Sequence, residues 1–226
     1  MENYQIEYQD LQPKPLKKPL NILFNILLLV AFIISFAPRV LISRAAQYYE
    51  KGDFENALLY FNITTWISPR KREAYYGRGL THARLKQLEL ALDDFSKAIK
   101  IDPTFAAAYV GRCHIHNQQK DFDVAISDCT KAIELSTDEI IVYFNRGFAY
   151  LAQEEDRLAV IDFTRAVELD ANNKSAYCFL GIAYMRTHEF SEAIVAFERG
   201  INLDNNNELE WCRTALANAR QVVPTP

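Results

Sequence analysis

Apolar and small residues recur at a fixed interval of 34 residues over about four fifths of the chain, from about Pro38 to Arg220. One position of the pattern is always alanine, at Ala57, Ala91, Ala125, Ala159 and Ala193. A second position holds small residues, namely Ala45, Gly79, Cys113, Gly147, Gly181 and Ala215. A third holds aromatic side chains, namely Tyr75, Tyr109, Tyr143, Tyr177 and Trp211. A constant interval of this length is typical of a solenoid built from repeated helix pairs.

Each interval predicts two antiparallel helices, which in the third unit cover Phe105–Gln118 and Asp121–Leu135. The small residues let the two helix axes approach closely, and the aromatic side chains fill the space beside them. Because one helix pair does not bury its apolar face alone, neighbouring pairs stack and share a core. A last helix over residues 208–220 repeats only the first half of the pattern, so we interpret it as a polar capping helix.

These columns resemble those of the tetratricopeptide repeat (TPR) family. Five repeats fit, over residues 38–71, 72–105, 106–139, 140–173 and 174–207. The proline of the family near the end of each repeat is kept at Pro69 and Pro103 but is replaced by Thr137, Ala171 and Asn205. The resemblance implies an all-α, right-handed solenoid of five helix pairs with a capping helix, and leaves residues 221–226 as a tail.

The N-terminal residues follow a different pattern. Residues 1–19 contain Pro13, Pro15 and Pro19, which disfavour a helix, and we interpret them as a flexible arm. Residues 20–37 then form a run of eighteen without a charge, about 27 Å long as a helix, which predicts one uncleaved transmembrane helix. Its apolar side chains include Leu20, Leu23, Phe24, Leu27, Val30, Phe32, Ile34 and Phe36.

Two alternatives to a transmembrane anchor stay open for residues 20–37. A buried solenoid helix is disfavoured because the segment lacks polar columns, and a cleaved signal peptide is disfavoured by the long preceding arm and by Pro38 after Ala37. The segment is preceded by lysines 14, 17 and 18 and followed by Arg39, Arg44 and Lys51, so the positive charges on its two sides are equal and its orientation stays open. We slightly favour an N-terminus inside, with the repeats on the other side of the membrane. The expected location is a bacterial inner or thylakoid-type membrane.

Composition and motifs argue against catalysis and against nucleic-acid binding. The 226-residue chain has a net charge of −4, whereas a nucleic-acid-binding surface is basic. We find no catalytic Ser/His/Asp set, no glycine-rich phosphate loop and no zinc-type cysteine spacing. Cys113, His114 and His116 point in different directions on a helix, so a metal site is not expected. We therefore predict no enzyme activity, no cofactor and no small-molecule substrate.

The four cysteines fall at positions of the repeat pattern. Cys113 and Cys129 occupy packing columns of one repeat, so we interpret them as buried packing thiols, with a disulfide in an oxidising compartment as the alternative. Cys178 and Cys212 lie 34 residues apart on neighbouring first helices. Packed helix axes are about 8–10 Å apart, and a disulfide needs Cα atoms within about 7 Å, so we expect no bond between these two.

A second regular feature is a set of paired charges. Arginine recurs at Arg78, Arg112 and Arg146, and aspartate recurs at Asp94, Asp128 and Asp162. In the fifth repeat both members are lost together, to Leu180 and Ala196. This joint loss predicts an ion pair inside each repeat, whereas the alternative is an arginine ladder for an anionic ligand. Exposed pairs of this kind contribute only about 0–1 kcal/mol each.

The family resemblance implies that other proteins bind the concave surface formed by the first helices. The expected groove is lined by Tyr76, Leu80, Val110, His114, Ile141, Phe144, Phe148, Cys178, Ile182 and Met185. The alternative is that the capping helix closes over part of this face. A clamp for C-terminal carboxylates, which some family members have, is not expected because only Asn145 resembles its residues.

We therefore predict a membrane-tethered TPR module that acts as a scaffold or assembly factor by binding an apolar segment of a partner protein. Its expected partners are membrane or peripheral proteins, together with membrane lipid around the N-terminal helix. A permanent structural subunit of a membrane complex is the alternative. A short N-terminal span followed by a small TPR domain resembles thylakoid and cyanobacterial proteins of photosystem assembly.

Overall fold

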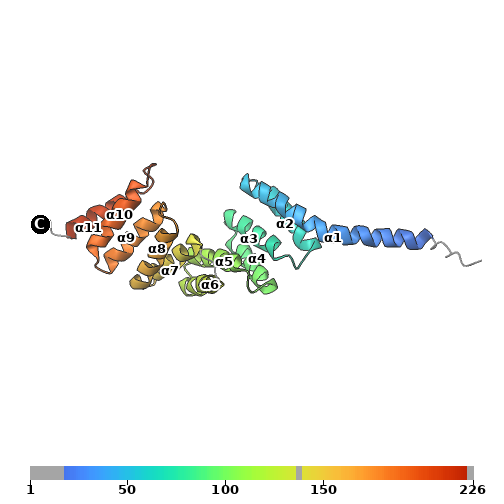
Figure 1. Ribbon diagram of the computed structural model, residues 1–226, viewed down its shortest axis with the longest axis horizontal. Coiled ribbons are helices and arrows are strands. Elements are labelled where there is room, and N and C mark those ends of the chain that lie inside the picture. The colour runs from blue at the N-terminus through green and yellow to red at the C-terminus, as the bar shows by residue number, and fades with distance from the viewer. Residues whose placement is uncertain (1–17, 136–138, 223–226) are drawn as a thin grey trace, which may run out of the picture.

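The computed structural model describes residues 18–135 and 139–222, which form eleven helices and no strand. The helices are α1 (Lys18–Glu50), α2 (Phe54–Ile67), α3 (Arg72–Arg84), α4 (Leu88–Ile101), α5 (Ala106–Gln119), α6 (Phe122–Glu134), α7 (Ile140–Ala152), α8 (Asp156–Leu169), α9 (Lys174–Arg186), α10 (Phe190–Asn202) and α11 (Glu210–Val222). They form an elongated array with the N-terminal part of α1 at one end and α11 at the other (Figure 1). The predicted arm, the turn at Thr137 and the predicted tail lie outside the described residues, except that α1 begins at Lys18 and α11 continues to Val222.

Each even-numbered helix from α2 to α10 folds back on the helix before it and also contacts the helix after it. All five alanines of the 34-residue column are fully buried between paired helices. The second helices insert phenylalanine rings towards the small-residue positions. A Cβ atom at Gly79, a member of the small-residue column, would lie 2.8 Å from the ring of Phe95, and one at Gly111 in the next repeat would lie equally close to the same ring. The small residues are therefore required by the close approach of neighbouring helices.

Helix α1 differs from the sequence prediction of two separate elements. It runs without interruption from Lys18 to Glu50, so the apolar segment and the first helix of repeat one are a single helix. Pro38, which we expected to mark the boundary, lies buried inside it. Among the residues that the structure describes, no helix is long and apolar enough to cross a membrane. The predicted transmembrane helix over residues 20–37 is therefore not supported.

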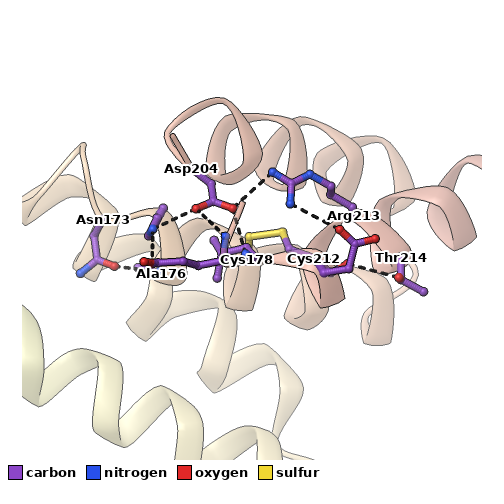
Figure 2. The surroundings of a disulfide bond; sticks show 11 residues. Asn173, Ala176, Cys178, Asp204, Cys212, Arg213 and Thr214 are labelled. Atoms are coloured by element: carbon purple, nitrogen blue, oxygen red, sulfur yellow. Dashed lines mark hydrogen bonds and ion pairs between the residues drawn. A yellow bond between two sulfur atoms is a disulfide. The ribbon is translucent and has the colours of Figure 1, made fainter. Parts of the chain in front are cut away.

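The C-terminal end of the solenoid is covered by α11. Leu209, Cys212 and Leu216 pack into one core with Phe197 of α10 and Cys178 of α9. Cys178 and Cys212 form a disulfide with a Cα–Cα distance of 5.8 Å, so the expectation of no bond was wrong (Figure 2). The reason is that an axis separation of about 8–10 Å overestimates the distance between residues that face each other across two helices.

Cys113 and Cys129 are buried as predicted, but they are bonded to each other and are not free thiols. Cys113 and Cys129 form a disulfide inside repeat three, with a Cα–Cα distance of 5.6 Å. No described cysteine is free. The bond takes the place of the contact between a small residue and a phenylalanine ring that Gly147 and Phe163 make in the next repeat. Cys129 therefore replaces a phenylalanine, and its covalent bond to Cys113 keeps the two helices of the repeat connected at this position.

Asp204 organises the turn between α10 and α11. Its buried carboxylate accepts hydrogen bonds from the Lys174 ammonium at 2.9 Å, from the backbone N–H of Leu209 at 2.8 Å and from that of Glu208 at 3.2 Å. The Arg213 guanidinium also donates to it, at 3.3 Å (Figure 2). These contacts bring α9, the turn and α11 to one carboxylate beside the disulfide.

The stability of this cap is expected to fall at acid pH. Burial alone would raise the pKa of Asp204, but the hydrogen bonds from Lys174, Leu209 and Glu208 outweigh it and lower the pKa from 3.8 to about 2. A carboxyl whose pKa is lower in the folded chain stabilises the fold above the unfolded pKa, and this contribution disappears as the pH falls from about 4 to about 2. Thermal unfolding at a series of pH values should show this loss in the native protein and less of it in Asp204→Asn. An identical pH dependence in both proteins would contradict the assignment.

Candidate functional site

The first helices of repeats two, three and four lie next to one another and enclose an apolar pocket. Helix α5 contacts both α3 and α7. Between the three helices lies a cavity of about 240 Å³. Five of the predicted groove residues line it, namely Tyr76, Leu80, Val110, His114 and Ile141. Asn145, Glu139 and Phe95 also line it, so most of the surface is apolar and a few polar groups lie within it.

Asn145 is the polar residue in this pocket that most needs an acceptor. Its side chain is 4% exposed, and within the described residues its Nδ2 has no hydrogen-bond partner. Its Oδ1 lies 3.5 Å from Nδ1 of His114, while Nε2 of His114 lies 2.7 Å from Nε2 of Gln118. The amide nitrogen of Asn145 is therefore a buried donor without an acceptor among the described residues, beside an otherwise apolar pocket.

Tyr76, which lines the pocket, is held in place by aromatic contacts. The Tyr76 ring lies 5.9 Å from that of Phe95 and 5.3 Å from that of Phe105, measured between centroids. Burial raises the pKa of the Tyr76 hydroxyl, and the carboxylate of Glu139 raises it further. The phenol of Tyr76 therefore stays neutral at physiological pH and adds no charge to the pocket.

Phe144 and Phe148, which we predicted to be exposed groove anchors, have different environments. Phe144 is half-buried, with ring centroids 5.6 Å from Phe163 and 5.3 Å from Phe179. Phe148 is 36% exposed and contacts Phe179 and Phe122. Phe144 thus joins repeats four and five, so replacing it would change stability as well as any binding.

Phe179 was missed in the sequence analysis, although the sequence contains a signal for it. The equivalent positions of repeats two to five hold Gly77, Gly111, Asn145 and Phe179. Of these repeats, only repeat five has an aromatic side chain there. The Phe179 ring stacks on Phe163 and reaches Trp211 of α11, with a centroid distance of 5.2 Å. It occupies at repeat five the position that is small or polar at repeats two to four.

The last three predicted groove residues lie under the capping helix. Cys178 is buried and bonded to Cys212, and Ile182 and Met185 pack against the core that α11 covers. This is the alternative that the sequence left open for this end of the face. The pocket described above is formed at repeats two to four, and the predicted stripe does not continue openly into repeat five.

The predicted Arg–Asp pairs are confirmed and are more buried than expected. Arg78 donates to both carboxylate oxygens of Asp94, at 2.8 and 2.6 Å, and the same bidentate pairing joins Arg112 to Asp128 and Arg146 to Asp162. The side chains of the three aspartates are 2–5% exposed.

Each of these guanidinium groups also reaches the preceding repeat. Arg146 donates from its remaining nitrogen to Thr130, Arg112 to Ser96, and Arg78 to both Asn62 and Thr65. The charge of each arginine is thus matched inside its own repeat, and its spare donors join two repeats. An arginine ladder that binds an anionic ligand is not supported by this arrangement.

Comparison with known proteins identifies the repeats. The tetratricopeptide repeat matches residues 73–105, 140–173 and 175–207. A crystal structure of MamA is similar at 21% identity, with a TM-score of 0.64, over 76% of this chain and 96% of MamA. A Pseudomonas aeruginosa pilF structure has a TM-score of 0.71 at 17% identity, over 85% of this chain and 95% of that one.

A third similar structure is that of YrrB, described as a TPR protein with an unusual peptide-binding site. It has a TM-score of 0.64 at 17% identity, over 80% of this chain and 90% of YrrB. No curated protein matches the chain. At these identities the solved structures show the fold alone. The predicted TPR repeats and the all-helical solenoid are therefore confirmed.

Proposed function

Given that the chain contains tetratricopeptide repeats, we propose that it is a protein–protein interaction module that binds an apolar segment of a partner in the pocket between α3, α5 and α7. The observation that carries the proposal is the buried Asn145 amide, which lacks an acceptor among the described residues and lies in a mostly apolar pocket. TPR proteins in general are interaction modules, and the YrrB structure is described as having a peptide-binding site.

The chemistry of the pocket favours an extended segment. In a helix, each backbone carbonyl group except the last four is bonded within the helix and is not free for Asn145. An extended segment offers a free carbonyl oxygen to the Asn145 amide and places an aliphatic side chain between Leu80, Val110 and Ile141. The expected ligand is therefore an extended, apolar stretch of polypeptide.

We further propose that the N-terminal part of α1 tethers this module to a membrane, so that it serves as a scaffold or assembly factor there. Residues 20–37 carry no charge, and the side chains of Phe24, Leu27, Val30 and Phe36 are exposed. A permanent structural subunit is the second candidate. Stoichiometric co-purification with one complex after detergent extraction favours the subunit, and trace amounts with assembly intermediates favour the assembly factor.

The pocket is tested with peptides selected against the purified protein from a random library. Asn145→Ala should weaken binding of the selected peptides about tenfold, because a buried hydrogen bond is lost at a cost of about 1–3 kcal/mol. Leu80→Glu should abolish binding, because it introduces an unpaired charge into the apolar pocket. Isothermal titration measures both, and circular dichroism checks that each variant is folded.

The matched control is Leu90→Glu, which introduces the same charge on α4 at an exposed site outside the pocket lining. It should bind the selected peptides as the native protein does. If folded Leu80→Glu and Leu90→Glu bind equally well, the peptides occupy another surface and the pocket assignment is wrong.

A further inference from the structure

The outer face of α2 carries an apolar stripe that the repeat pattern does not require. Trp66 is 83% exposed, and Leu59 and Ile63 precede it at helical spacings and are also exposed. In the four later repeats, the positions that correspond to Trp66 are Lys100, Glu134, Glu168 and Asn202. Those that correspond to Ile63 are Lys97, Lys131, Arg165 and Arg199. At the positions of Ile63 and Trp66, repeat one alone is apolar and every other second helix is polar or charged.

The Trp66 end of this stripe lies near the point where the apolar N-terminal part of α1 extends beyond the solenoid. Helix α2 has 14 residues and folds back along α1 after the turn at Gly52, so its C-terminal end lies near Pro38. The residues of α1 before this level extend beyond α2 (Figure 1). Trp66 therefore sits at the edge of the solenoid from which the exposed side chains of Phe24, Leu27 and Val30 project.

The same edge is basic, although the whole chain has a net charge of −4. A depression of about 490 Å³ follows α2 and is lined by Pro69, Arg70, Tyr75, Lys97, Lys100 and Ile101. Lys97 is paired with Asp93 at 2.6 Å. Arg70 and Lys100 are exposed, and neither forms an ion pair within the described part of the chain. Two exposed cations thus lie in the depression that follows α2, and the last turn of α2 carries the exposed Trp66.

We propose that this edge, formed by Ile63, Trp66, Arg70 and Lys100, rests on an anionic lipid surface into which the N-terminal part of α1 inserts. Tryptophan favours the boundary between lipid headgroups and hydrocarbon, and arginine and lysine are attracted to anionic headgroups. The combination of an aromatic residue, two cations and an adjoining uncharged segment fits a bilayer surface. The inference rests on the proposed membrane tether and adds to it a fixed contact between repeat one and the lipid.

The test uses the full chain and the fluorescence of Trp66. The sequence contains two tryptophans, so Trp211→Phe leaves Trp66 alone and Trp66→Phe leaves Trp211 alone. Both variants are reconstituted with phosphatidylcholine vesicles that contain 30% phosphatidylglycerol and brominated acyl chains, which quench nearby tryptophan. We expect both proteins to float with the vesicles, Trp66 to be strongly quenched, and Trp211 at the far end to stay unquenched.

The headgroup contribution is tested in the Trp211→Phe protein by Arg70→Gln/Lys100→Gln. The docking equilibrium constant, read from the quenched fraction of Trp66, should fall about tenfold, and vesicles without phosphatidylglycerol should have a similar effect. Lys86→Gln/Lys120→Gln removes the same charge from the turns inside repeats two and three. These turns lie at the opposite ends of the helix pairs, so this control should leave quenching unchanged.

The possible outcomes separate the two proposals. A protein that floats with unquenched Trp66 retains its tether but has no docked edge, which overturns the inference. A protein that does not float overturns both the tether and the inference. Quenching that is unaffected by Arg70→Gln/Lys100→Gln and by lipid charge overturns the anionic recognition. Shielding of Trp66 from iodide in a lipid-free dimer would show that a second copy covers the edge instead.

Discussion

Asp162→Ala is expected to lower the free energy of unfolding by about 3 kcal/mol or more, which is far beyond the effect of losing a surface ion pair. The Asp162 carboxylate is 2% exposed and is the bidentate partner of Arg146. Its removal leaves the guanidinium of Arg146, which is itself 17% exposed, without a counter-charge between repeats three and four. Urea unfolding followed by circular dichroism measures the loss.

Repeat five provides the matched control for this substitution. It has Leu180 and Ala196 at the two equivalent positions, and both are buried in one apolar cluster. Arg146→Leu/Asp162→Ala copies that pair into repeat four and should recover most of the stability lost in Asp162→Ala, because no buried charge remains unpaired. A double variant that is as unstable as the sum of the two single variants would show that the pair does not act as a unit.

The success of the ion-pair prediction has a physical reason. In a solenoid each repeat meets the same neighbours, so residues that vary together at a fixed interval of 34, as Arg146 and Asp162 do, also lie together in space. The alanine column was predictable for the same reason, because each of its members fills the same contact between paired helices. The burial of the charges was not predictable, since it depends on how closely the preceding repeat approaches.

The features that the sequence analysis missed lie where the periodicity ends. Phe179 closes the face at repeat five, and the signal was a single large residue in a column of small ones. At the other end, Pro38 was taken as a boundary, but α1 continues through it. The pocket covers only part of the predicted groove. Five of its ten predicted residues meet in the pocket of repeats two to four, and the others pack between repeats or under α11.

The disulfide between Cys178 and Cys212 is the largest single constraint on the C-terminal cap. It joins residues 34 apart and links α9 to α11. A cross-link that closes a loop of this length stabilises a fold by about 3–4 kcal/mol, mainly by restricting the unfolded chain. Cys178→Ala/Cys212→Ala should therefore lower the free energy of unfolding by about that amount, and reduction of the native protein should do the same.

A matched comparison uses the second disulfide. Cys113 and Cys129 are 16 residues apart within one repeat, so Cys113→Ala/Cys129→Ala should destabilise the protein by about 3 kcal/mol without releasing the cap. Loss of the Cys178–Cys212 bond should release α11 from Met185 and Ile182, so that the backbone amides of this part of α9 exchange faster. Loss of the Cys113–Cys129 bond should not change this exchange. Equal exchange of α9 in both double variants would contradict a specific role in holding the cap.

Thiol counting under denaturing conditions decides whether the bonds form in the cell. Protein extracted with an alkylating agent present should carry no label on its four cysteines if both bonds exist before extraction. Disulfides persist in oxidising compartments and are rare where thiols are kept reduced. Full protection would therefore place the repeats in an oxidising compartment. Complete labelling would mean that the cap is held in the cell by noncovalent contacts, such as those of Leu209, Leu216 and Asp204.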